Sequence, residues 1–460
     1  MALVDPRSAR PTRAVLLGAA AAGLAAGGVA LWRRARRGPP LPRERSLDST
    51  AALLREGYLF IGRRCRTLGS DVFRTRLMGR PAICAQGEAA ARMFYEPGLF
   101  TRRGALPPTA LLSLQDLGSV NQLDGAAHRW RKALFLDLVG SDRVAALGAA
   151  FDAEWRVAAE AWARAHRIVL FDEVREVITR AVCAWAGAPL APGEARRRAR
   201  EFGAMIDGAG AVGPRNWRGL LLRARTERWA RRLIADARSG RRRAPPGSPL
   251  EAVAFHRDLD GRRLPVAIAA VELLNLLRPT VAVDRYIAFA ALALHRHPGW
   301  RERLARDGAA RTAFAQEVRR LYPFFPAVGG RALQPFAWRG RRFRRGTWVI
   351  LDLFGTNRDP KSWREAEAFR PERFLTDEPN AHNFIPQGGG DPATGHRCPG
   401  EPITLELMDR ALAWLAGEMR YEVPAQDLSV RLDRMPAIPA SRMVLSGVRP
   451  AGAPARAAPA

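Results

Sequence analysis

The stretch Phe384-Ile-Pro-Gln-Gly-Gly-Gly-Asp-Pro-Ala-Thr-Gly-His-Arg-Cys398-Pro-Gly-Glu401 places a single cysteine in a loop rich in glycine. Glycine lets the backbone turn tightly and come close to a flat group. His396 and Arg397 precede the cysteine, and the run Pro402–Met408 after it has the pattern of a helix. Because a helix N-terminus favours a nearby thiolate over a thiol, we expect Cys398 to be the reactive residue of this loop.

Two interpretations of Cys398 follow from the residues around it. A single cysteine in an apolar chain is usually a small core residue. The alternative is a thiolate ligand, which the flanking glycines, Arg397 and the Pro-Gly pair after the cysteine favour. A thiolate in a glycine loop that leads into a helix is one way to hold a haem iron from one face.

The charge of the chain is unusual for its length. The 460 residues have a formal net charge of +29, nearly all from arginine, since Lys132 and Lys361 are the only lysines. A solvated arginine-rich surface explains this, and attraction to acidic partners or an anionic membrane is the functional alternative. The arginines are scattered and form no zinc-finger, helix-turn-helix or RNP signature, so we expect no nucleic-acid partner.

The four cysteines exclude two further classes of site. No pair has CxxC spacing, so the sequence has no zinc signature. Four cysteines in a chain of this length do not make a disulfide framework. We therefore expect a reducing compartment and a cytoplasmic protein.

Three segments divide the chain. Residues 1–45 form a basic, Ala- and Gly-rich segment, in which residues 14–37 contain an uncharged run from Val15 to Trp32 flanked by arginines. This run has 18 residues, 11 of them Ala or Gly, so it is marginal for a spanning helix, which needs about 20 apolar residues. A membrane anchor, a targeting segment and an over-long start all fit it. Residues 46–448 are expected to form the folded domain, and residues 449–460 a disordered tail.

Apolar periodicity predicts a mainly helical domain with a small strand-rich part. Alternation over Asp71–Met78, followed by Pro81–Ala85, predicts a hairpin, and Arg339–Leu353 has the same strand pattern. The predicted helices are 128–138, 145–165, 170–186, 194–206, 217–237 and one long apolar helix over 265–295.

Glu317 and Arg320 are spaced to pair on one face of a helix. Their surroundings are apolar, and a buried Glu–Arg pair must be closely matched to be tolerated. Downstream, the segment Phe369-Arg-Pro-Glu-Arg373-Phe374 supplies Arg373 as a third member. The cysteine loop follows it.

The order Glu-x-x-Arg, Pro-Glu-Arg-Phe and Gly-rich cysteine loop resembles a cytochrome P450 over about 46–448. The resemblance implies a mainly α fold, a helical prism with small β-sheets around a buried haem. It implies haem b as cofactor, Cys398 as the thiolate ligand of its iron, and a structural role for Glu317, Arg320 and Arg373.

The centre of the long helix departs from the family pattern. Most members carry an acid beside a threonine there, whereas this chain has Arg278-Pro279. Proline inside a helix removes a hydrogen bond and kinks it. A buried arginine must find an anion. Glu272 or Asp284 on the same helix is one candidate, and a substrate carboxylate held by two parallel hydrogen bonds is the other.

Arg278-Pro279 resembles the fatty-acid peroxygenase branch of the cytochromes P450, as do Gln316–Pro326, Asp124–His128 and the cysteine loop. The resemblance implies α- or β-hydroxylation, or decarboxylation, of long-chain fatty acids with hydrogen peroxide and without a reductase. The substrate carboxylate on Arg278 would supply the acid–base group. A reductase-dependent P450 monooxygenase and a non-catalytic haem or fatty-acid binding protein are the alternatives.

The same resemblance assigns further candidate residues. Asn121 stands where the branch has Gln or His near the haem, and asparagine cannot act as a base. His128 and Lys132, with Arg131 beside them, are expected to meet the haem propionates; Arg102, Arg103 and Arg397 are further basic candidates at the cofactor. Asp284 and Arg285 are unusually polar for this helix, and they either pair with each other or narrow the pocket.

Overall fold

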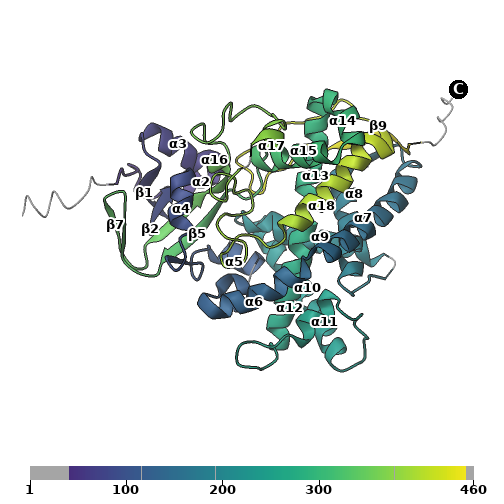
Figure 1. Cartoon of the computed structure of the whole chain (residues 1–460), viewed down its shortest axis with the longest axis horizontal. Helices are drawn as coiled ribbons and strands as arrows, with labels where there is room; N and C mark the ends of the chain where they lie inside the picture. The colour runs from purple at the N-terminus through teal and green to yellow at the C-terminus, as the bar shows by residue number, and fades with distance from the viewer. Residues whose placement is uncertain (1–40, 115–116, 192, 378, 452–460) are drawn as a thin grey trace, which may run out of the picture.

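Helices form one side of the molecule and a small sheet with short helices forms the other (Figure 1). The computed structural model describes residues 41–114, 117–191, 193–377 and 379–451. The longer helices are α6 (Gly125–Leu138), α7 (Ser141–Trp162), α8 (Leu170–Trp185), α9 (Glu194–Ala209), α10 (Pro214–Arg238), α12 (Val266–Val281), α13 (Asp284–Arg296), α15 (Gly308–Leu321) and α18 (Glu401–Ala413). Short helices are α2 (Thr50–Glu56), α3 (Phe60–Thr67), α4 (Glu88–Phe94), α5 (Pro108–Leu114), α11 (Pro249–Phe255), α14 (Arg301–Arg306), α16 (Leu353–Thr356), α17 (Arg373–Thr376) and the single turn η2 (Val120–Gln122). The predicted mainly helical fold is confirmed.

The largest sheet has five strands in the order β1–β2–β8–β5–β3. These strands are β1 (Val72–Leu77), β2 (Arg80–Ala85), β3 (Phe100–Thr101), β5 (Ala327–Ala332) and β8 (Trp348–Asp352). β1 and β2 form the predicted antiparallel hairpin, with Phe73 opposite Cys84. A second sheet pairs β10 (Val444–Pro450) with β4 (Arg167–Val169) and β9 (Met419–Glu422), and β6 (Phe336–Trp338) pairs with β7 (Arg341–Phe343).

The long apolar helix predicted over 265–295 is two helices, α12 and α13, separated at Ala282–Val283. Pro279 lies in the last turn of α12, where it cannot donate the backbone hydrogen bond that a helix needs. The prediction of one helix was therefore wrong, and the break lies just beyond the proline. Among the described residues, the run Val266–Arg296 is the one stretch long and apolar enough to cross a membrane, but 72% of its apolar window is buried in the core.

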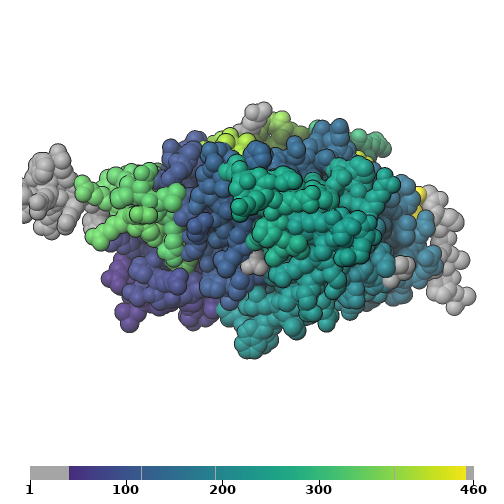
Figure 2. All heavy atoms as spheres, turned by 90° about the horizontal axis from the view of Figure 1, so that it is seen from below, coloured from purple at the N-terminus to yellow at the C-terminus, as the bar shows by residue number. Residues whose placement is uncertain are grey.

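The main core surrounds this pair of helices. α12 packs on α8, α9 and α10, and α13 packs on α8, α15 and α18. Figure 2 views the molecule from below, where the teal atoms that include α10 and α11 cover the helical body. The cysteine loop enters α18, so the central helices lie next to the candidate site.

The described structure extends past both predicted domain boundaries. Leu41 is buried, and the Arg74 backbone N–H donates to the carbonyl of Pro42 (2.7 Å). At the other end β10 continues to Pro450, which pairs with Met419. Residues 41–45 and 449–450 therefore pack with the rest of the described structure, through the bridge of Arg43 to Arg74 and through β10. The proposed membrane contact through residues 14–37 and the rest of the predicted tail lie outside the described residues.

Candidate active site

Cys398 lies in the wall of a cavity of about 480 Å³. Its backbone N–H donates to the carbonyl oxygen of Gln387 (3.2 Å). The side-chain amide nitrogen of Gln387 is 3.8 Å from the Cys398 sulfur and donates to the Thr404 hydroxyl (3.1 Å). The loop therefore directs a side-chain N–H group toward the sulfur.

The glycines of the loop are required by close packing. A Cβ atom at Gly389 would lie 2.5 Å from the carbonyl oxygen of Ala381, and one at Gly390 would lie 2.9 Å from the Cβ atom of Tyr95. Gly390 also has a positive φ of 76°, which favours glycine. These glycines therefore let the loop pack closely against Tyr95 and Ala381.

Helix α6 holds the loop from the other side. Lys132 donates from Nζ to the carbonyl oxygen of Arg397 (2.8 Å) and also to that of Gly395. One turn earlier, the ring of His128 lies on the ring of His396, with 4.1 Å between centroids. The structure thus brings together three of the predicted cofactor residues, His128, Lys132 and Arg397.

The charges at this contact favour an anion. Burial, followed by Arg102, His128 and Lys132, lowers the pKa of His396 to about 2. Burial and then Lys132 lower the pKa of His128 to about 4, and burial lowers that of Lys132 to about 8. Since an added negative charge would oppose these shifts, the residues present fit the propionate groups of a haem.

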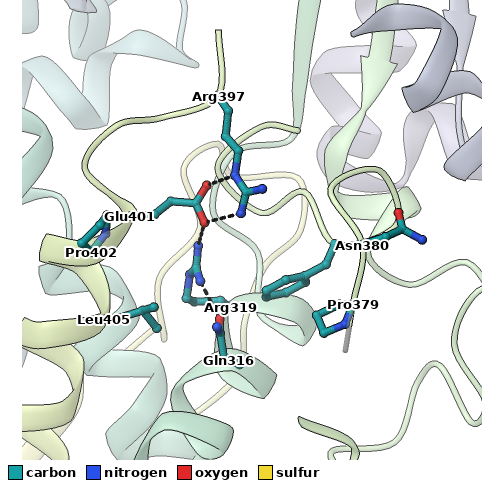
Figure 3. Close-up of a pocket in the computed structure, with 9 residues that line it drawn as sticks. Gln316, Arg319, Pro379, Asn380, Arg397, Glu401, Pro402 and Leu405 are labelled. Atoms are coloured by element: carbon teal, nitrogen blue, oxygen red, sulfur yellow. Dashed lines mark hydrogen bonds and ion pairs between the residues drawn. The ribbon is translucent and has the colours of Figure 1, made fainter. Parts of the chain in front are cut away.

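A surface pocket lies beside the Cys398 loop (Figure 3). Glu401 accepts hydrogen bonds from Arg397 Nε (2.6 Å) and Arg319 Nη2 (2.7 Å). Arg319 also donates to the side-chain oxygens of Gln316 (2.5 Å) and Gln387 (2.9 Å). This network joins α15 to the start of α18, and it orients the Gln387 amide that faces the sulfur.

The predicted Glu317, Arg320 and Arg373 cluster is present and buried. Both carboxylate oxygens of Glu317 accept from Arg320 (2.7 and 2.8 Å), and Arg373 Nε lies 3.3 Å from one of them. Arg320 donates further to the backbone carbonyls of Ala366 (2.8 Å) and Ala368 (3.1 Å). The cluster therefore ties α15 to the segment before the cysteine loop.

The thiol of Cys398 does not follow the expectation from the helix N-terminus. Burial, followed by Glu401, raises its pKa above the ordinary value. The Gly400 backbone, Lys132 and Arg319 act in the opposite direction but do not outweigh burial. A nearby cation such as a metal ion would stabilise the thiolate.

Arg278 lines the same cavity and is buried. Its guanidinium donates to the carbonyl oxygen of Leu114 and to the side-chain oxygen of Asn275 (3.3 Å). Both acidic partners considered for it are engaged elsewhere: Glu272 with Arg131 (2.9 Å), and Asp284 with other arginines. Within the described residues, Arg278 has no carboxylate partner.

Burial and the positive charge of Arg223 lower the pKa of Arg278 to about 9. The cavity wall around Arg278 offers few proton donors. Asn121, in η2, and Pro279 both line the cavity. Thr280 also lines it, but its hydroxyl donates to the carbonyl oxygen of Leu276 (2.9 Å).

Three of the basic candidates differ in their surroundings. Arg102 is close enough to both histidines to affect their pKa values, and it donates to the carbonyl oxygen of Gly329 (2.7 Å). Arg103 is exposed. Arg131 pairs with Glu272 and Asp258, which favours His128 and Lys132 over Arg131 as the residues that meet the propionates.

Sequence reasoning missed Arg319, Glu401, Gln387 and His396 as members of the site. Each lies inside a motif that was recognised for another residue. Arg319 and Glu401 meet across 82 positions of sequence, a distance at which spacing carries no signal. Asp284 and Arg285 do pair, at 2.8 Å, as one of the two expectations had it.

The comparisons with known proteins agree on a family. The cytochrome P450 family model matches residues 312–440. The first curated relative, tabersonine/lochnericine 19-hydroxylase of Catharanthus roseus, is 32% identical over 117 residues, which cover 24% of this chain and 22% of that enzyme. The chain thus matches less than a quarter of this relative's length.

Solved structures match over nearly the whole chain. Cytochrome P450SP alpha (CYP152B1), in complex with (R)-ibuprophen, is 45% identical with a TM-score of 0.86, covering 88% of this chain and 100% of that chain. Cytochrome P450EX alpha (CYP152N1) with myristic acid is 39% identical with a TM-score of 0.87, covering 90% and 100%. A variant of cytochrome P450 OleT in complex with arachidonic acid is 31% identical with a TM-score of 0.88, covering 90% and 100%. The chain therefore belongs to the cytochrome P450 family, in its CYP152 fatty-acid peroxygenase branch, and binds haem b through a cysteine thiolate.

Proposed function

We propose that this protein is a haem-thiolate peroxygenase that hydroxylates long-chain fatty acids at the α or β carbon, or decarboxylates them, with hydrogen peroxide and without a reductase. The observation that carries the proposal is Arg278, a buried guanidinium without a carboxylate partner among the described residues, in the cavity that also contains Cys398. Structural relatives with myristic acid and arachidonic acid support the substrate class.

The energetics of Arg278 support a carboxylate ligand. Burial disfavours its charged form, and Arg223 disfavours it further. A charge-assisted hydrogen bond contributes about 1.5–3 kcal/mol, and a bidentate pair also fixes orientation. Each buried CH₂ group of the chain adds about 0.8 kcal/mol. A long acid therefore binds mainly through its chain, while Arg278 sets the position of the carboxylate.

The residues of this chain have separate roles in the proposed reaction. We assign Cys398 as the haem ligand, and His128, Lys132, Arg102 and Arg397 as the basic residues near its propionates. The haem supplies peroxide-dependent oxidation when bound. Arg278 holds the substrate carboxylate, which moves the proton that peroxide cleavage requires, since Asn121 cannot act as a base.

The lack of a free proton donor supports peroxide use over a reductase-dependent reaction. Thr280 is occupied by a backbone carbonyl. Asp352 is the one acidic residue among the described lining residues of the cavity, and it accepts the Gly355 N–H at the start of α16 (2.8 Å). We therefore assign the proton transfer to the substrate carboxylate on Arg278, in the place where most P450s have an acid beside a threonine.

The test is incubation of the purified, haem-loaded protein with myristic acid and hydrogen peroxide, without reductase, followed by mass spectrometry. Hydroxylated acid or terminal alkene is expected. Turnover only with NADPH and redox partners would favour a monooxygenase, and no product under either condition would favour a binding protein.

Two variants separate the roles of the site. Arg278→Ala should abolish peroxide-driven turnover of long acids, whereas Arg228→Ala, an exposed arginine of α10, should not change it. Full activity of the Arg278 variant would refute the carboxylate role. Cys398→Ala should remove the reduced-CO absorption band of a thiolate-ligated haem, and a retained band would assign the ligand to another cysteine.

A further inference from the structure

The helix pair α12–α13 contains a charged cluster that the proposed reaction does not use. Arg285 is fully buried, and it donates to Asp284 (2.8 Å) and to Asp207 of α9 (2.5 Å). Arg175 of α8 donates from Nε to the second oxygen of Asp284 (2.6 Å). The cluster thus joins three helices inside an otherwise apolar body.

Two more arginines surround Asp207 and leave the cluster with excess positive charge. Arg215 donates to the carbonyl oxygen of Met435 (3.0 Å), and Arg434 precedes that residue. Burial raises the pKa of Asp207, but Arg285, Arg175, Arg434 and Arg215 outweigh it and hold the pKa below its ordinary value. Four guanidinium groups therefore act on two carboxylates.

Several nitrogens of these guanidinium groups have no partner within the described part of the chain. The buried unpaired atoms are Arg175 Nη2, Arg215 Nε, Arg285 Nε and Arg434 Nε. Each buried, unpaired donor costs free energy unless a ligand satisfies it. The cluster lacks negative charge and hydrogen-bond acceptors together, which is the condition of an anion site without its anion.

The cluster borders the substrate cavity. Arg285, Gly210 and Met435 line the same cavity as Arg278. Arg278 lies in the last turn of α12 and Arg285 in the first turn of α13, on either side of the break at Ala282–Val283. An elongated ligand in this cavity would contact the guanidinium groups of both Arg278 and Arg285.

We propose that the Arg175, Arg215, Arg285 and Arg434 cluster is a second anion-binding subsite, which takes the distal carboxylate of an α,ω-dicarboxylic fatty acid. The inference rests on the proposed function, because the first carboxylate lies on Arg278. A dicarboxylic chain matches the arrangement better than a separate small anion, since Arg285 of the cluster lines the cavity that would hold the chain.

The test compares myristic acid with tetradecanedioic acid, which has the same chain length, by calorimetric titration of the haem-loaded protein. In an apolar pocket a second carboxylate would weaken binding strongly. We expect the diacid to bind at least as tightly as the monoacid. Diacid binding more than about tenfold weaker than myristate binding would overturn the subsite.

Single substitutions test which arginines bind the distal carboxylate. Arg434 has no ion pair within the described residues, so Arg434→Gln leaves no acid unpaired, and it should weaken diacid binding about tenfold while changing myristate binding less than about twofold. Arg215→Gln should give the same pattern. Arg431→Gln, three residues before Arg434 and exposed, is the matched control and should change neither. Equal loss for both acids in Arg434→Gln would overturn the subsite.

Competition by inorganic phosphate shows whether a small anion binds at the second subsite or at Arg278. Phosphate should weaken diacid binding and leave myristate binding unchanged. Competition with both acids would place the anion at Arg278 and contradict the second subsite. If myristate itself does not bind, the proposed function fails, and the diacid inference fails with it; myristate binding with weak diacid binding overturns the inference alone.

Discussion

Burial controls the charge of individual residues around the cavity. It lowers the pKa of Arg278 to about 9 and that of Lys132 to about 8, and it raises that of Asp352 to about 7. In each case the protein interior disfavours the charged form. The charged forms of Arg278 and Lys132 are therefore destabilised until an anion binds beside them. Asp352, by contrast, keeps its proton and is uncharged below about pH 7.

Asp352 gives a pH-dependent stability with a definite sign. Its pKa is 3.8 in the absence of burial and about 7 in the folded protein. Between these values the folded state binds more protons than the unfolded state, so the free energy of unfolding decreases as pH rises from about 4 to about 7. The pKa difference corresponds to at most about 4 kcal/mol.

Asp352→Asn should therefore remove most of this slope and stabilise the protein above pH 7, because asparagine keeps an oxygen for the Gly355 N–H. Urea unfolding of wild type and variant at pH 5 and pH 8 measures the effect. Parallel pH dependence of the two proteins would show that Asp352 is not the titrating group.

Gly389 supports a second prediction at the residue scale. A Cβ atom added at Gly389 would clash with the carbonyl oxygen of Ala381 and would also lie 2.6 Å from the Ile385 side chain. Gly389→Ala should displace the cysteine loop, lower stability by about 1–3 kcal/mol and reduce the reduced-CO band. Gly299→Ala is the control, since nothing lies within 4 Å of a Cβ there. Equal thermal midpoints and bands in both variants would contradict the packing argument.

At the scale of elements, local patterns predicted the helices and the β1–β2 hairpin. They did not predict that the long apolar helix is interrupted between α12 and α13. Apolar periodicity continues through Ala282–Val283, so one helix was expected. Pro279 was a local sign of a kink, but not of the two-residue break after it. The ion pairs of Asp284 and Arg285 with α8 and α9 belong to partners 109 and 78 residues away, so the sequence did not predict them. The Glu317–Arg320 pair was predictable because both residues lie on one helix turn.

Pro279 follows Arg278 in the last turn of α12, and we expect it to position that turn. Without its N–H group the carbonyl of Asn275 loses the helical hydrogen bond. Pro279→Ala should restore that bond and leave the thermal midpoint unchanged or higher, since proline costs up to about 3 kcal/mol in a helix. The shifted Arg278 should lower kcat/KM for myristate about tenfold or more. Pro214→Ala, in the first turn of α10, where proline is tolerated, is the control; unchanged kcat/KM in Pro279→Ala would contradict a positioning role.

At the scale of the whole molecule, the chain has a net charge of +29, and many arginines of the described residues are exposed on the surface. Helix α10, on the face shown in Figure 2, presents Arg218, Arg225, Arg228, Arg231 and Arg232 to solvent. Such a field attracts anions from a distance, whereas in the proposed site the affinity of a bound acid would depend on Arg278 and the cavity. Charge therefore acts on the rate of association more than on the bound state.

The rate of fatty-acid binding should consequently depend on salt. Screening shortens the range of the field to about 10 Å at 0.1 M ionic strength and about 3 Å at 1 M. The association rate constant of myristate should fall several-fold between these conditions, because steering by a strongly charged protein contributes about tenfold or more. The dissociation rate constant should change little, since Arg278 is buried.

Stopped-flow mixing of the haem-loaded protein with myristate measures both constants, and myristyl alcohol, which has the same chain without the charge, is the control. An equal salt effect on the alcohol and the acid would show that salt acts on hydrophobic binding and not on a long-range attraction.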